Sequence, residues 1–132
     1  MRKFLFVIIA VIALTGCGCK EGPSPADVAG KAAEQYYSYL LHRDYSAFVD
    51  GMNYANPIPK DYRRVLEDNA ASFLHDQDSI HGGIKSAQFS RANIMPNDST
   101  AAAVYLMLTY GNNTKEEVLV PMVKRNDVWY MK

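Results

Sequence analysis

The sequence predicts an α+β domain, with three N-terminal helices packed on a curved antiparallel sheet of about four strands. In the first part of the chain, up to Gly82 and Gly83, apolar residues recur at helical spacing. After the glycine pair, short apolar segments are separated by turn-forming residues, a pattern typical of an antiparallel meander.

The first helix is expected from Pro25 to about Leu41. Ser24 is a good N-cap residue, and proline suits the first helical position. Tyr37 falls off the apolar stripe, so we expect it at the surface. The residues of that stripe are Val28, Ala32, Tyr36, Tyr39 and Leu40.

A second, short helix is expected after the cap residue Asp44, ending near Gly51 to Asn53. Residues 53–59 hold two prolines and form a connector. The third helix begins at about Pro59 and ends before Gly82. Its predicted stripe contains one polar residue, Asn69, among Tyr62, Val65, Leu66, Ala70, Phe73 and Leu74.

Four strands are expected after the glycine pair. The second strand is apolar at odd and even positions alike, which predicts that both of its faces are covered. Pro121 in the third strand indicates an edge or a bulge, because proline has no N–H for a sheet ladder. The expected strands are Ile84 to Ile94, Thr100 to Tyr110, Lys115 to Lys124 and Val128 to Lys132.

The N-terminus has the features of an export signal. Arg2 and Lys3 precede an apolar run that is about half the length needed to span a bilayer. The run ends in Leu14-Thr15-Gly16-Cys17, which resembles the bacterial lipobox. This resemblance implies cleavage before Cys17, whose sulfur then carries a diacylglycerol, with palmitate among the acyl chains. The alternative is an ordinary cleaved signal, and Cys19 is a poorer anchor because no aliphatic residue begins the triplet before it.

These signals divide the chain into a signal peptide (1–16), a tether (17–24) and one α+β domain (25–132). Cleavage leaves 116 residues with 12 basic and 14 acidic side chains, a formal net charge of −2. This balance lacks the basic footprint of a nucleic-acid-binding protein. Both cysteines precede the domain, so we expect no internal disulfide and no thiolate metal site there. We assign no cofactor.

Two segments of the domain carry a resemblance to a known superfamily. The run from Tyr36 to Phe48 places aromatic residues at the end of a long helix, just before a short helix that starts at an Asp. The run from Asn126 to Met131 is a polar turn followed by a strand with a Trp. Both resemble the nuclear transport factor 2-like (cystatin-like) superfamily, and with the lipobox the chain is similar to small lipoproteins with a lumazine-binding-like domain of unknown function. Many members carry strands between the second and third helices, for which residues 53–59 are too few.

The resemblance implies a pocket between helices and sheet, although the same apolar side chains can simply fill a core. The superfamily includes enzymes such as ketosteroid isomerase and scytalone dehydratase, which use a carboxylate or histidine inside the pocket. Here His42, Glu116 and Glu117 do not converge, so we assign no catalytic residue. The candidate pocket residues are Tyr36, Phe48, Asn69, Phe73, Tyr105, Met107 and Trp129.

One further cluster combines possible metal ligands with a helix end. His75, Asp76, Asp78 and His81 are suitable ligand types, but their spacing matches no metal signature, and a solvated helix C-terminus explains them better. We therefore assign no metal site. The triplets around Ser79 and Ser99 resemble acceptors for O-glycosylation of exported proteins.

The sequence favours a lipid-anchored protein on the periplasmic or cell-surface side of a bacterial membrane. We expect a non-catalytic binding or accessory module whose partners are membrane lipid, through acylated Cys17, and a small apolar ligand or another protein. The alternatives are an isomerase-like or dehydratase-like enzyme with a cone-shaped pocket, and a structural envelope protein that forms a homodimer through its sheet.

Overall fold

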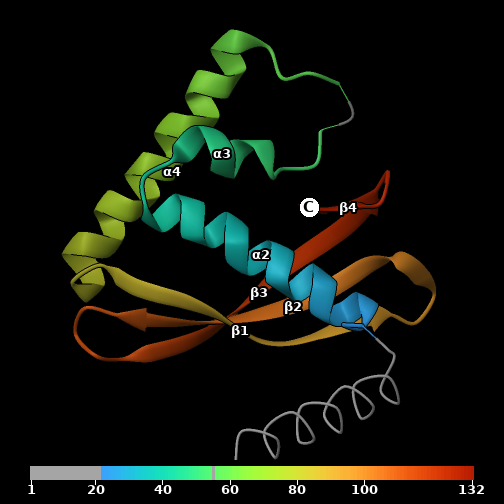
Figure 1. The fold of residues 1–132 in the computed structure, drawn as a ribbon. Coiled ribbons are helices and arrows are strands. Elements are labelled where there is room, and N and C mark those ends of the chain that lie inside the picture. Colours follow the sequence, from blue (N-terminus) through green and yellow to red (C-terminus); the bar gives the residue numbers. More distant parts are fainter. Residues whose placement is uncertain (1–21, 55) are drawn as a thin grey trace, which may run out of the picture.

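The computed structural model describes residues 22–54 and 56–132 and confirms the predicted α+β fold. Helix α2 lies across one face of a curved four-stranded antiparallel sheet, and α4 stands beside it (Figure 1). The elements, in chain order, are α2 (Pro25–Leu41), α3 (Tyr45–Asp50), α4 (Lys60–His81), β1 (Ile84–Met95), β2 (Asp98–Tyr110), β3 (Lys115–Arg125) and β4 (Val128–Met131).

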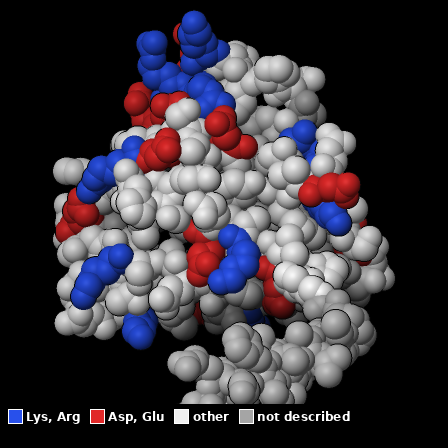
Figure 2. All heavy atoms as spheres, in the orientation of Figure 1, with Lys and Arg blue, Asp and Glu red and all other residues white. Residues whose placement is uncertain are grey.

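The predicted signal peptide and Cys17 lie outside the described residues. Among those residues, no helix is long and apolar enough to cross a membrane. The face in Figure 2 carries basic and acidic side chains interspersed over its surface.

The helix ends are set by local hydrogen bonds that the sequence predicted. The amide N–H of Asp27 donates to Ser24 Oγ at 3.2 Å, and the amide N–H of Ala47 donates to Asp44 Oδ1 at 3.2 Å. Gly82 ends α4 in the left-handed region, with φ of 75°. The starts of α2 and α3 and the end of α4 therefore follow from capping chemistry.

The main core forms between α2 and the sheet. Ala29 and Ala33 are fully buried there, and Gly30 lets the Phe89 ring of β1 pack directly on the helix backbone. This buried face is rotated from the predicted stripe. Val28 is 44% exposed, whereas Tyr37, which we expected at the surface, packs between the two clusters of the core. The small residues allow close approach to the sheet, and this approach turns Tyr37 inward.

Helix α4 buries only one side of its predicted stripe. Ala70 and Leu74 pack against Leu40, whereas Tyr62, Val65 and Phe73 are 41–49% exposed. The helix packs against α3 and the start of β1 instead of lying over the sheet. Tyr62 meets the Tyr54 ring of the connector edge to face, with centroids 6.0 Å apart, whereas no helix or strand among the described parts of the chain covers Val65 and Phe73.

The two faces of β2 differ, which corrects the expectation that both are covered. The residues facing α2, including Val104 and Leu106, are fully buried. On the opposite face Tyr105 is partly buried, with the guanidinium of Arg91 3.9 Å from its ring centroid. Long side chains of neighbouring strands thus shield this face in part, without a second layer among the described residues.

Candidate binding cavity

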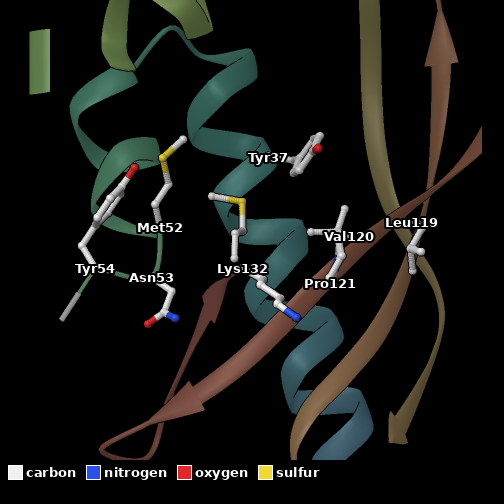
Figure 3. A pocket seen from close by; sticks show the side chains of 9 residues that line it. Tyr37, Met52, Asn53, Tyr54, Leu119, Val120, Pro121 and Lys132 are labelled. Atoms are coloured by element: carbon white, nitrogen blue, oxygen red, sulfur yellow. The ribbon is translucent and has the colours of Figure 1, made fainter. Parts of the chain in front are cut away.

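A cavity of about 380 Å³ lies beside β3, where the connector that follows α3 reaches the end of β4 (Figure 3). This volume is within the range of small-ligand sites. Four separate segments of the chain form its walls. The lining residues are Tyr37 of α2, Met52, Asn53 and Tyr54 of the connector, Leu119, Val120 and Pro121 of β3, and Met131 and Lys132 at the C-terminal end of β4.

Backbone hydrogen bonds hold the connector against β4. Met52 and Met131 form an isolated parallel bridge. The Asn53 N–H donates to the Met131 carbonyl at 2.9 Å, and the Met131 N–H donates to the Gly51 carbonyl at 2.7 Å. Gly51 is required here because the Tyr36 ring lies where a Cβ would be. These contacts hold Met52 and Met131 at the cavity.

Arg125 fixes the next part of the connector. Its Nε donates to Asn53 Oδ1 at 3.0 Å, and its Nη2 donates to the Tyr54 carbonyl at 2.9 Å. The guanidinium also lies 4.5 Å from the centroid of the Tyr130 ring, a cation–π distance. Arg125 thereby links the turn after β3 to the cavity rim.

Tyr37 reaches the cavity from α2. Its ring meets Phe48 edge to face, with centroids 6.0 Å apart, and burial raises the pKa of the Tyr37 hydroxyl above its ordinary value. The hydroxyl is therefore protonated at neutral pH and can donate a hydrogen bond. Tyr37 is the residue of α2 that lines the cavity.

The lining groups suit a ligand with an apolar body and a polar or anionic end. Methionine adapts its shape to irregular ligands, and Met52, Val120 and Met131 provide the apolar surface. The Asn53 amide and the Lys132 ammonium supply hydrogen-bonding and charged groups at the rim. The arrangement can therefore bind by apolar contact, hydrogen bonding and charge.

The residues we predicted for a pocket lie in three other places. Tyr36, Phe48 and Trp129 belong to the main core, where the Tyr36 hydroxyl donates to the Trp129 carbonyl at 2.6 Å. Phe48 does not line the cavity, but it packs on Tyr37, which does. Tyr105 and Met107 lie on the sheet face opposite α2, and Asn69 and Phe73 are exposed on α4.

Two features of the sequence relate to the cavity, but no local pattern connects them. Pro121 indicated an edge, and it lies where pairing between β3 and β4 ends. Asn53 and Tyr54 lie in the connector between α3 and α4. Their meeting with Tyr37 depends on contacts between distant segments, so no local pattern could reveal it.

Three ionisable residues that the sequence singled out, Glu116, Glu117 and His81, contact other side chains outside the cavity lining. The Tyr110 hydroxyl donates to Glu116 Oε1 at 2.6 Å, and the His81 ring stacks on Tyr110 with centroids 4.2 Å apart. Burial, and then the bond to Glu116, raises the pKa of Tyr110 to about 12. On the opposite face of the sheet, Glu117 pairs with Arg91 at 3.2 Å. Among the described residues, no three His, Cys, Asp or Glu side chains are grouped to hold a metal ion.

Comparison with solved structures supports a nuclear transport factor 2-like (NTF2-like) domain. A Campylobacter jejuni protein described as an NTF2-like transpeptidase superposes with a TM-score of 0.56 at 14% identity, covering 75% of this chain and 92% of that one. Aln2 from a Streptomyces species has 15% identity over 84% of this chain and 89% of its own, with a TM-score of 0.40. No protein-family model and no curated protein matches the sequence. At such low identity the first similarity establishes the fold, which is NTF2-like.

Proposed function

We propose that this protein is a lipid-anchored component of the bacterial cell envelope that acts as a non-catalytic binding module. Its binding site is the cavity lined by Tyr37, Met52 and Lys132 together with β3. The lipobox ending at Cys17 supports the anchor, and the NTF2-like fold supports the kinship with small lumazine-binding-like lipoproteins. The observation that carries the binding role is the cavity, with its apolar walls and polar rim.

The cavity chemistry favours an amphipathic ligand. Apolar side chains on three segments remove water from the ligand body, which is the main source of affinity. Lys132 at the rim attracts an anionic end, and the Asn53 amide can hydrogen-bond to a polar group on the ligand. A lipid tether would hold this site close to the membrane surface, where such molecules are concentrated.

Native mass spectrometry of the full chain purified in mild detergent tests the binding role. We expect a retained small molecule, and we expect the anionic apolar dye anilinonaphthalene sulfonate to bind in competition with it. Lys132→Trp should block the cavity and weaken dye binding roughly tenfold. The matched control is Lys60→Trp, because Lys60 is exposed at the start of α4 and does not line the cavity. Equal dye binding by both variants would contradict this site.

A further inference from the structure

Strand β4 covers only part of the neighbouring edge of β3. The paired residues of β3 run from Met122 to Arg125, and the Lys132 N–H adds one bond to the Pro121 carbonyl at 3.0 Å. Strand β3 begins at Lys115. Within residues 22–54 and 56–132, no strand pairs with the stretch from Lys115 to Val120 on that side.

The hydrogen-bond pattern shows which backbone groups face this open edge. In an antiparallel pair, alternate residues direct both N–H and C=O to the same neighbour. The Tyr110 N–H donates to the Thr114 carbonyl at 2.9 Å. The even-numbered residues of β3 therefore direct their N–H and C=O groups toward β2. The bond from the Lys132 N–H to the Pro121 carbonyl shows that the odd-numbered residues direct their backbone groups toward the β4 side. The N–H and C=O groups of Glu117 and Leu119 therefore point to the open edge.

The outer edge of β1, by contrast, is partly blocked. Glu34 of α2 accepts the Phe89 N–H there at 2.7 Å. In the part of the chain that the structure describes, the Glu117 and Leu119 backbone groups have no such partner, and Leu119 is 54% exposed. An unpaired edge of this kind is a template for another extended chain.

The open edge adjoins the cavity. Leu119, Val120 and Pro121 form part of the cavity wall (Figure 3). Val118 and Val120 face the helix side of the sheet, so an added strand would direct alternate side chains to that same side. Glu116 lies on this side too and has an exposed side chain. The site thus offers unpaired backbone groups, an apolar cavity wall and a carboxylate, with the side chains at alternate positions along one strand.

We propose that the open edge of β3 binds an extended peptide segment of another protein by strand addition. The segment pairs with the backbone of Glu117 and Leu119, places an apolar side chain in the cavity and places a basic side chain beside Glu116. This proposal rests on the cavity being the binding site proposed above, and it adds a second class of ligand, an extended peptide, whose apolar side chain competes with the small ligand for the cavity.

Charge and space argue against a second copy of this chain as the occupant. Lys132 occupies the position opposite Pro121, where it would clash with a second β3 strand that extended that far. A symmetric antiparallel pairing of β3 with its copy must therefore be centred at Glu117 or nearer the start of the strand. Such pairing places Glu117, or Glu116, directly opposite the same residue of the copy. Like charges directly opposite one another destabilise a strand pair.

The test uses the full chain in mild detergent and synthetic capped peptides. In each peptide, threonine alternates with residues whose side chains would lie on the helix side of the sheet after strand addition. One helix-side residue is varied among aliphatic and aromatic types, and the next is lysine. Amide hydrogen exchange of Lys115 to Pro121 reports strand addition. We expect at least one peptide to slow exchange there, whereas the same peptide with N-methylated backbone amides binds at least tenfold more weakly. A glutamate in place of the lysine should also weaken binding.

The Leu119 position provides a matched pair of variants. Leu119→Pro removes the edge N–H while leaving pairing with β2 intact, as Pro121 already does at the same register. Leu119→Ala trims the side chain and keeps the N–H. We expect roughly tenfold weaker peptide binding for Leu119→Pro than for Leu119→Ala. Melting curves show whether each variant folds, and the N-methylated comparison on the unaltered chain does not depend on them.

Three outcomes would overturn strand addition. The first is that no peptide of the set binds, and the second is that the N-methylated peptide binds equally well. The third is slow amide exchange of Lys115 to Pro121 with no peptide added, because this would show that another part of the chain covers the edge. A small molecule retained in the cavity together with any of them would leave the proposed binding role standing. Loss of both peptide and dye binding would reject the two proposals together.

Discussion

Gly30 shows how one residue sets the distance between helix and sheet. In an exposed helix interior, alanine is better than glycine by about 1 kcal/mol. At Gly30, however, an added Cβ would overlap the Phe89 ring. We expect Gly30→Ala to lower the free energy of unfolding by roughly 1–3 kcal/mol, because overpacking outweighs helix propensity. Urea unfolding measures this change.

Two comparisons isolate the cause of that loss. Gln35→Ala, at an exposed position of the same helix, should be nearly neutral. In a Phe89→Ala background, Gly30→Ala should cost little or become favourable, since the ring is gone. An equal loss in both backgrounds would show that the Phe89 ring is not the obstacle.

Tyr110 predicts a dependence of stability on alkaline pH. Its pKa in the folded protein is about 12, against about 10 in an unfolded chain. The contribution of Tyr110 is fully present below about pH 10 and is lost as the pH rises toward 12, because the unfolded chain releases the proton first. Unfolding measured at about pH 9 and about pH 11 should show a smaller decrease for Tyr110→Phe than for the unaltered chain. Identical decreases would contradict this assignment.

Among the elements, the connector after α3 depends on Arg125. Two hydrogen bonds from its guanidinium hold Asn53 and Tyr54 in place. We expect Arg125→Met to lower the free energy of unfolding by roughly 1–2 kcal/mol and to speed amide exchange in residues 52–54. Arg64→Met on the exposed side of α4 is the control and should do neither. Unchanged exchange in the Arg125 variant would mean that backbone bonds to β4 suffice.

In helix α4, only part of a clear apolar stripe is buried. Its stripe has helical spacing, yet only the flank with Ala70 and Leu74 packs on the rest of the domain. Phe73 is 41% exposed, so its truncation forfeits few contacts. The pattern therefore predicts that this segment is a helix but not how deeply each apolar residue is buried.

For the whole molecule, the proposed anchor depends on Cys17. We expect Cys17→Ser to move the protein from the detergent-rich phase to the aqueous phase, because acyl chains supply firm membrane attachment. Cys19→Ser is the matched control and should leave the protein in the detergent-rich phase. Phase separation followed by immunoblotting measures both variants, and the reverse result would assign the lipid to Cys19.

Local signals in the sequence were sufficient for the element boundaries and the fold class. Ser24 and Asp44 begin helices because their side chains satisfy free N–H groups, and Gly82 ends one because it adopts a positive φ easily. These effects involve residues close in sequence, so they can be read without the fold. The change of period after Gly83 likewise identified the sheet.

The cavity required knowledge of how the elements dock. Tyr36 and Tyr37 are adjacent and identical in type, yet the Tyr36 hydroxyl bonds the Trp129 carbonyl in the core, while Tyr37 lines the cavity. The orientation of α2, whose small residues pack closely on the sheet, determines which tyrosine enters the core and which lines the cavity. The open edge of β3 depends in the same way on where β4 ends against it. Both features arise from contacts between segments far apart in the chain, whose geometry depends on packing across the whole domain.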